Sequence, residues 1–216
     1  MKIAFLYTLD ANKVLFCPYI EQYLSDDNVM IAHHVNEQLL KQAMADGLTE
    51  AVVSLIQQEV QDIAATGADI IICTCSTIGN AAEQTDNIDS KVIRVDRPMA
   101  EKAITQTRVH VLAALDSTID PTLSLLAQCA QQHGTSPDIS YAVIPNAWPY
   151  YANGDTESYA KVIAEYVEQE VYGYDNIVLA QASMAPALGY INQPPAPVLS
   201  SPELCCKAIA DYLPKD

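Results

Sequence analysis

The chain has 216 residues, of which 50% are hydrophobic and 18% charged, and its formal net charge at pH 7 is -16. This composition is typical of a folded globular protein, and the length allows one domain or two compact halves. The negative charge argues against nucleic acid or anionic membranes as partners, because phosphate binding needs clustered Lys and Arg.

The sequence holds no apolar run long enough for a signal-peptide core or a membrane span, so we expect a cytoplasmic protein. Its six cysteines lie mostly within apolar runs. A chain of this length without a signal does not suggest a disulfide framework, and most of these thiols are expected to be buried.

The first part of the chain has apolar runs of strand length at about residues 2–8, 29–34, 69–75 and 92–95. A helix is predicted between the second and third runs, because apolar residues at 52, 56, 60 and 63 fall on one face and Gly67 follows as a stop signal. Strands and helices therefore alternate.

The second part repeats this alternation, with apolar runs at about residues 109–115, 139–144, 176–182 and 196–199. Asp120 is a predicted helix cap after the first of these runs, and Asp155 is another after the second. Ser201 and Pro202 begin the last predicted helix.

Continuous apolar strands that alternate with helices predict parallel sheets covered on both faces. We therefore predict an α/β protein of two pseudo-twofold-related, doubly wound parallel-sheet halves with a cleft between them. The first half is expected to span residues 1–97 and the second half residues 98–199. The C-terminal helix, residues 200–216, is expected to pack back on the first half.

One segment occurs twice. Residues 69–77 form a short apolar run that ends in small polar residues, and residues 176–184 have the same profile. This match makes Ala182 the counterpart of Cys75. If the two halves face each other, only one strand end brings a thiol to the cleft.

A second pair of segments supports the duplication, since residues 6–12 resemble residues 112–118. The spacing from Asp10 to the cysteine is 65 residues, and the spacing from Asp116 to the alanine is 66. Similar spacings of this kind are stronger evidence for a repeat than either short match.

The most reactive candidate is Cys75. Ligands of open parallel sheets bind beyond the carboxyl ends of the strands, and a thiol placed there just before a helix meets the positive end of that helix. That position stabilises the thiolate as a base or nucleophile. The alternative is an inert buried thiol, which is the interpretation that we favour for Cys73, one pleat deeper in the strand.

Histidines and a carboxylate near the end of the second strand are weaker candidates. His34 is a possible base or orienting group, and His33 and Glu37 lie close to it in sequence. A structural role is the alternative for each of them.

Three charged residues follow other strands. Asp10 and Asp116 are candidates for substrate binding, and helix or turn caps are the alternative. Arg97 is a candidate partner for a substrate carboxylate, and an ion pair with Asp96 is the alternative.

The sequence has no Gly-rich nucleotide loop, no Gly-x-Ser-x-Gly elbow, no Cys-x-x-Cys pair and no His cluster at metal spacing. No cofactor and no metal are therefore expected.

These features resemble the aspartate/glutamate racemase superfamily, which includes hydantoin racemases, maleate isomerases and arylmalonate decarboxylases. The resemblance lies in the duplicated α/β halves, in Cys75-Ser76-Thr77 at the first motif, and in residues 179–184 at the second. It implies cofactor-independent chemistry next to a carboxylate, with one cysteine from each half, and a homodimer. It also implies substrate-binding roles for Ser76, Thr77, Ser117, Thr118, Ser183 and Met184.

A two-base racemase needs a proton-transferring group on each face of its substrate, and the methyl group of Ala182 cannot serve. We therefore predict an isomerase or lyase acting next to the carboxylate of a small amino acid or dicarboxylate. Cys75 is its acid/base or nucleophile, and Ser183 is the nearest catalytic group for the second face. The alternatives are a carboxylate-binding protein without activity and an amide or ester hydrolase that uses Cys75 with His34.

Overall fold

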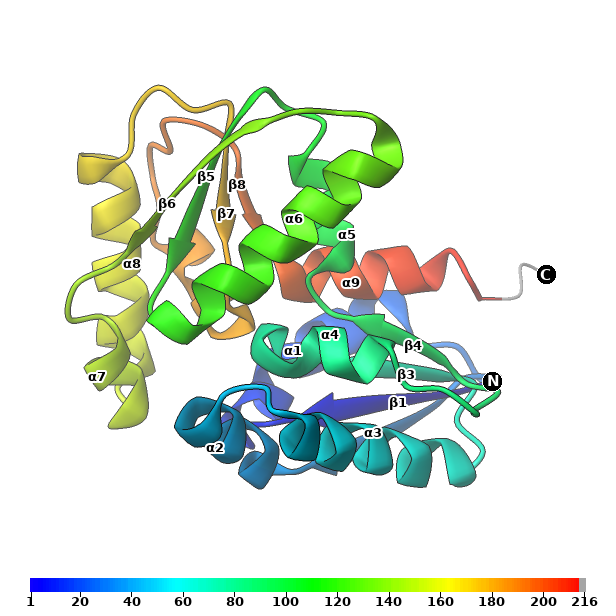
Figure 1. The fold of residues 1–216 in the computed structure, drawn as a ribbon. Coiled ribbons are helices and arrows are strands. Elements are labelled where there is room, and N and C mark those ends of the chain that lie inside the picture. Colours follow the sequence, from blue (N-terminus) through cyan, green and yellow to red (C-terminus); the bar gives the residue numbers. More distant parts are fainter. Residues whose placement is uncertain (214–216) are drawn as a thin grey trace. The chain divides into compact units, whose positions relative to one another are not determined.

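The computed structural model describes residues 1–213 and divides the chain into two compact units. The first unit comprises Met1–Val95 and the residues from Pro202 onward, and the second comprises Asp96–Ser201. Each unit has a parallel sheet flanked by helices (Figure 1).

The first unit has the strand order β2-β1-β3-β4, and every pairing in it is parallel. The strands are β1 (Lys2–Tyr7), β2 (Met30–Val35), β3 (Ile70–Cys73) and β4 (Lys91–Arg94). The helices are α1 (Ala11–Tyr23), α2 (Glu37–Asp46), α3 (Glu50–Ala65), α4 (Ser76–Glu83) and, from Pro202 onward, α9 (Ser201–Ala210).

Local signals explain these elements. Strand β3 is buried along its whole length, as expected for an apolar central strand covered on both faces. Helix α3 begins where the Thr49 side chain accepts a hydrogen bond from the Val52 amide at 3.4 Å. Its buried residues recur with helical spacing and pack against the sheet beside α2 and α4, as Figure 1 shows for α3.

Two contacts tie the C-terminal segment to the rest of the first unit. The Tyr23 hydroxyl of α1 donates a hydrogen bond to Glu203 of α9 at 2.7 Å. The Lys91 ammonium at the start of β4 lies 3.8 Å from the centroid of the Tyr212 ring.

The second unit has the strand order β6-β5-β7-β8, again with parallel pairings. The strands are β5 (Arg108–Ala113), β6 (Asp138–Val143), β7 (Asn176–Leu179) and β8 (Val198–Ser200). The helices are α5 (Arg97–Ala103), α6 (Ile119–His133), α7 (Trp148–Ala152) and α8 (Thr156–Glu170), with short 3-10 helices η1 (Asp116–Thr118) and η2 (Ala182–Gly189).

The two units therefore share one topology, with the first strand of each unit at an inner position of its sheet. The prediction of an α/β protein built from two parallel-sheet halves is confirmed. The expected cleft between the halves stays a prediction.

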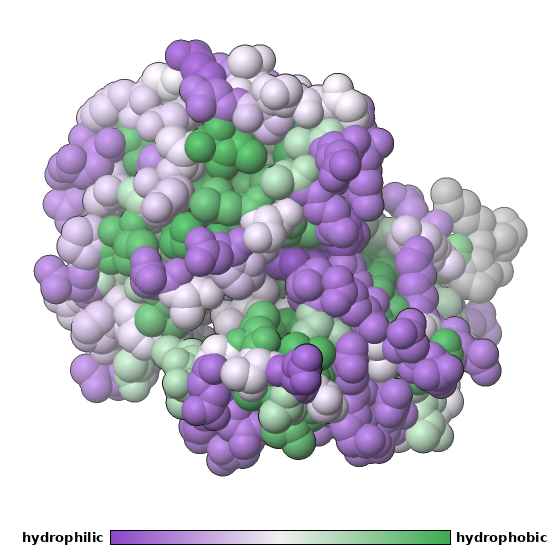
Figure 2. Space-filling view, viewed as in Figure 1, coloured by the Kyte–Doolittle hydropathy of each residue, from purple (hydrophilic) through white to green (hydrophobic). Residues whose placement is uncertain are grey.

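The chain has 27 Asp and Glu against 11 Lys and Arg. On the face shown in Figure 2, hydrophilic residues separate the hydrophobic patches. Within residues 1–213, no helix combines the length and the apolar character that crossing a membrane requires. All six cysteines are free thiols, and of these Cys17 is exposed.

Candidate active site

Cys75 follows the carboxyl end of β3. The Thr74 amide still donates to the Leu6 carbonyl of β1 at 3.0 Å, and the chain then leaves the sheet. Cys75 has extended backbone angles, φ -115° and ψ 116°, and occupies the position before the first residue of α4. Cys75 is a buried free thiol, with 8% of the residue's surface exposed. The thiol thus lies at the helix N-terminus that the sequence predicted.

Cys73 lies within the sheet and contacts this turn through its thiol. Its side chain is fully buried, and its thiol lies 3.6 Å from the Cys75 carbonyl oxygen, to which it donates a hydrogen bond. This is the core position that the sequence predicted for Cys73.

Ser76 and Thr77 form the start of α4, and both are largely buried. The first amides of a helix have no partner within the helix, and the helix dipole adds positive potential beside them. An anion at this end of α4 would meet backbone donors and, next to them, the Cys75 thiol.

Arg94 is a buried cation beside this turn, and sequence reasoning did not single it out. It lies on β4 with 2% of its surface exposed, and its guanidinium donates to the Ser76 carbonyl at 3.4 Å. Gly79 of α4 permits this approach, because a Cβ atom at position 79 would lie 3.0 Å from the Arg94 Cβ and 3.1 Å from its Nε. The missed signal was a glycine inside a predicted helix next to the thiol.

His33 belongs to an aromatic group on one face of the sheet. Its Nδ1 lies 3.1 Å from the Tyr7 hydroxyl, and its ring stacks on Tyr7 with centroids 5.7 Å apart. Burial lowers the pKa of His33, so packing favours its neutral form.

His34 points to the other face, but it does not adjoin the thiol. The register pairs His34 with Leu6 and Leu6 with Cys73, so that β1 lies between β2 and β3. Two strand spacings of about 4.8 Å separate the backbones of His34 and Cys73. Within residues 1–213 no hydrogen bond joins His34 to Cys75, and the role of His34 stays a prediction.

Asp10 precedes α1, and its side chain does not cap that helix. Its backbone amide donates to the Glu37 carboxylate at 3.5 Å, and Glu37 also pairs with Lys41 at 3.3 Å on the same helix. The capping alternative for Asp10 is therefore wrong, while its role toward a substrate stays a prediction.

Matching hydrogen bonds align the two units residue by residue. At the start of the inner strands, the Lys2 amide donates to the Asp69 side chain at 2.6 Å, and the Arg108 amide donates to the Asp175 side chain at 2.8 Å. In return, the Asp69 and Asp175 amides donate to the carbonyls of Lys2 and Arg108, both at 2.8 Å. Asp69 therefore corresponds to Asp175.

The same alignment holds at the other ends of these strands. The Thr74 amide donates to the Leu6 carbonyl at 3.0 Å, and the Ala180 amide donates to the Leu112 carbonyl at 2.9 Å. Thr74 therefore corresponds to Ala180, and the residue after each begins the site.

The counterpart of Cys75 is consequently Gln181, and the assignment of Ala182 was wrong by one residue. Gln181 precedes η2 with φ -116° and ψ 136°, close to the backbone angles of Cys75. The spacing from Asp116 to Gln181 is 65 residues, equal to that from Asp10 to Cys75. The error arose because small residues were matched to small residues, whereas ladder register decides equivalence in a strand. The second unit has no thiol at this position under either alignment.

Gln181 is held by the loop after β5. Its Oε1 accepts hydrogen bonds from the Ala114 amide at 2.7 Å and from the Leu115 amide at 3.0 Å. Only 9% of the residue surface is exposed. Sequence reasoning missed Gln181, although an equal spacing of 65 residues would have indicated it.

Ser183 is paired with a buried tyrosine of α8. The Tyr159 hydroxyl lies 3.1 Å from the Ser183 Oγ, and burial raises the pKa of Tyr159 far above its usual value of 10. Tyr159 is only 1% exposed. Both hydroxyls are buried, and either one can be the donor of this hydrogen bond.

Met184 lies beside Ser183 in η2. Its side chain is fully buried in the hydrophobic core of the second unit, with Leu112, Leu179 and Tyr159 in the same cluster. Its side chain thus packs in the core, and its role in substrate binding stays a prediction.

The remaining candidates lie at the start of α5 and in η1. Arg97 donates to Gln128 at 3.1 Å and contacts the Cys129 sulfur at 3.8 Å, so its guanidinium is directed to α6. Asp116 is exposed, Thr118 is 2% exposed, and the buried Ser117 Oγ has no hydrogen-bond partner among residues 1–213. Their roles in binding stay predictions.

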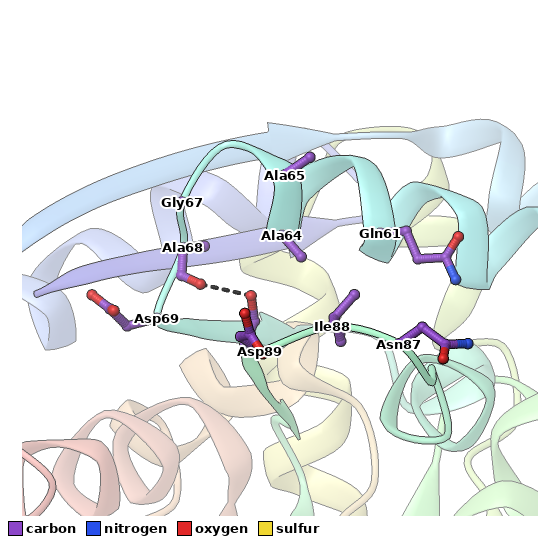
Figure 3. A pocket seen from close by; sticks show the side chains of 10 residues that line it. Gln61, Ala64, Ala65, Gly67, Ala68, Asp69, Asn87, Ile88 and Asp89 are labelled. Atoms are coloured by element: carbon purple, nitrogen blue, oxygen red, sulfur yellow. Dashed lines mark hydrogen bonds between the residues drawn. The ribbon is translucent and has the colours of Figure 1, made fainter.

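The first unit also has a surface hollow that lies away from the Cys75 thiol. A hollow of about 580 Å³ lies at the amino end of β3, lined by Asp69, Asn87 and Asp89 among others (Figure 3). Cys75 follows the opposite, carboxyl end of this strand. Ser90 bridges part of the hollow by donating to the Ala68 carbonyl at 2.6 Å.

Across residues 1–213, His, Cys, Asp and Glu side chains form no group of three or more that could hold a metal ion.

Comparison with solved structures gives extensive matches. A glutamate racemase from Thermus thermophilus, in complex with β-chloro-D-alanine, has a TM-score of 0.69 at 15% identity over 98% of this chain and 79% of that chain. An aspartate racemase from Picrophilus torridus has a TM-score of 0.66 at 14% identity over 98% and 93%. The chain has the fold of the aspartate/glutamate racemases.

The solved structure of a lyase also matches this chain. An arylmalonate decarboxylase mutant in its sulfate-associated form has a TM-score of 0.55 at 13% identity, over 98% of this chain and 94% of that chain. No protein-family model and no curated protein matches the sequence. At these identities the matches establish the fold, and they confirm the expectation of a racemase-like architecture.

Proposed function

We propose that the chain is a cofactor-independent isomerase or lyase that acts at the carbon next to the carboxylate of a small amino acid or dicarboxylate. Cys75 is its general acid/base or nucleophile. The observation that carries this proposal is a free thiol, 8% exposed, directly before an eight-residue helix at the carboxyl end of a central parallel strand.

The chemistry follows from this position. The start of α4 favours negative charge, both on the thiolate and on a nearby carboxylate. A thiolate can remove a proton from an activated carbon, and a thiol can return one to a carbanion. Fold neighbours that include racemases and a decarboxylase support this reaction class.

One thiol limits the reaction. Neither Gln181 nor Ala182 can act as an acid or base near neutral pH, because a carboxamide and a methyl group neither gain nor lose a proton in this range. We therefore propose that proton transfer takes place on one face of the substrate, as in a lyase, in an isomerase that shifts a proton along one face, or in an exchange reaction with retained configuration.

The second candidate is a carboxylate-binding protein without activity, and the absence of a second thiol favours it. The hydrolase alternative is weaker, because Leu6 stands between His34 and the strand that leads to Cys75. A Cys75 nucleophile would then lack its expected base.

Incubation of candidate amino acids and dicarboxylates in heavy water tests the proposal. We expect deuterium next to the carboxylate, or loss of carbon dioxide, with the wild-type chain and with Cys17→Ser, which removes the exposed thiol of α1. Cys75→Ser should abolish the reaction. Equal turnover by wild type and Cys75→Ser would refute the role of the thiol, and binding without turnover would favour the second candidate.

A further inference from the structure

Gln181 occupies the position of the second unit that corresponds to the thiol of the first. Two hydrogen bonds fix the orientation of its side chain. The Ala114 and Leu115 amides both donate to one side-chain atom, at 2.7 and 3.0 Å, and only the amide oxygen can accept them. The Nε2 group therefore points away from this loop.

The two Nε2 protons are the unused part of this side chain. Within residues 1–213, the described hydrogen bonds of the Gln181 side chain are the two that its oxygen accepts. The residue has 9% of its surface exposed, and its Nε2 is not among the fully buried, unpartnered side-chain atoms of residues 1–213. A fixed donor of this kind binds an acceptor without first losing rotamer freedom.

The Ser183 hydroxyl lies two residues further along and has a similar character. With Tyr159 as the donor of the hydrogen bond between them, the Ser183 proton is available to another acceptor. In that arrangement the turn after β7 offers donors from two side chains. In a chain with a net charge of -16, such local donors are needed to hold a small anion.

We propose that Gln181 is a carboxylate-binding residue, which donates hydrogen bonds from Nε2 to an oxygen of a small carboxylate ligand. This assigns a hydrogen-bond donor for a carboxylate to the strand end of the second unit that corresponds to Cys75. The choice of a carboxylate rests on the proposed function, whereas the donor itself follows from the hydrogen bonds of the Gln181 side chain.

Gln181→Glu is the sharpest variant. A glutamate keeps one oxygen for the Ala114 and Leu115 amides, so the turn should remain intact, but it replaces the two donors with a charged acceptor. Gln131→Glu is the matched control, because it introduces the same charge at an exposed position of α6 in the same unit.

Malonate serves as the probe. Binding is measured by calorimetry, and the side-chain amide signals are followed in nitrogen-15 NMR spectra, in which the Gln181 pair is assigned by its absence from Gln181→Glu. We expect malonate to shift the Gln181 pair. We also expect the dissociation constant to rise about tenfold or more in Gln181→Glu, the effect of losing a hydrogen bond to a charged group, and to stay unchanged in Gln131→Glu.

The result is independent of catalysis, because Cys75→Ser should bind malonate as the wild type does. Gln181-dependent binding without deuterium exchange in any substrate would support this inference and contradict the proposed function. Exchange that persists while malonate leaves the Gln181 signals unmoved, or equal malonate affinity in Gln181→Glu and wild type, would overturn the inference. Failure of the wild type to bind malonate would overturn it as well.

Discussion

Replacement of Gln181 by alanine should destabilise the second unit, and the size of the effect tests the geometry of its turn. The substitution removes the oxygen that accepts from the Ala114 and Leu115 amides. Ala114 is 6% exposed, so water cannot readily take over its hydrogen bond. Leu115 is half-buried, and its amide is easier to hydrate.

The magnitude follows from these two amides. A buried donor left without a partner costs about 1–3 kcal/mol, and a hydrogen bond that water can replace costs about 0.5–1.5 kcal/mol. We therefore expect Gln181→Ala to lower the free energy of unfolding by about 2–4 kcal/mol. Gln181→Glu keeps an acceptor for both amides and should change it by less than about 1 kcal/mol.

Urea unfolding followed by tryptophan fluorescence is a suitable assay, because the single tryptophan, Trp148, lies in α7 of the second unit. Gln131→Ala is the control for loss of a glutamine at an exposed helix position, where substitutions usually change stability by about 0.5 kcal/mol or less. If Gln181→Ala were no more destabilising than Gln131→Ala, the two hydrogen bonds would not hold the turn, and the reasoning about Gln181 would fail.

Three further outcomes follow from other contacts. Gly79→Ala should lower stability by about 1 kcal/mol in urea unfolding followed by circular dichroism, because crowding of Arg94 outweighs the gain in helix propensity of about 1 kcal/mol; a more stable variant would contradict this. Tyr159→Phe and Ser183→Ala should each cost about 1 kcal/mol, and the double variant should cost less than their sum, whereas full additivity would show that the two hydroxyls do not interact. The Arg108 side chain and amide hold the pKa of Asp175 below its usual 3.8, so this stabilisation should be complete above pH 3.8 and be lost as the pH falls through the lowered value. The difference in urea midpoint between wild type and Asp175→Asn should therefore shrink in acid, and a difference independent of pH would be contrary evidence.

Strong local patterns made the fold predictable from the sequence. Apolar runs placed the strands, and the alternation of runs with helical segments predicted parallel sheets, both of which the structure shows. Cys75 was predictable for the same reason, since a thiol directly after a buried strand and before a helix must lie near the helix N-terminus.

The alignment of the two strand ends was harder to predict from the sequence, because it depends on the hydrogen-bond register between strands. The two strand ends resemble each other only in having small residues, and a match shifted by one residue selected Ala182 instead of Gln181. Hydrogen bonds between strands distinguish these alignments, and those bonds join residues that are far apart in the sequence.

Side-chain partners were the least predictable features. Arg97 was the expected carboxylate partner from its place after a strand, yet its guanidinium contacts Gln128 on α6. Arg94, which lies against the thiol turn, is part of an apolar strand sequence and gave no signal by itself. Such contacts depend on tertiary packing rather than on local pattern.

The central claim is that one thiol, Cys75, transfers protons next to a carboxylate. Its most direct test is to incubate each enantiomer of a reactive substrate separately in heavy water and to follow deuterium incorporation and configuration by NMR. The account predicts incorporation from one enantiomer only, with retained configuration or with loss of carbon dioxide, and none in Cys75→Ser. Interconversion of both enantiomers at comparable rates, or incorporation that survives Cys75→Ser, would contradict it.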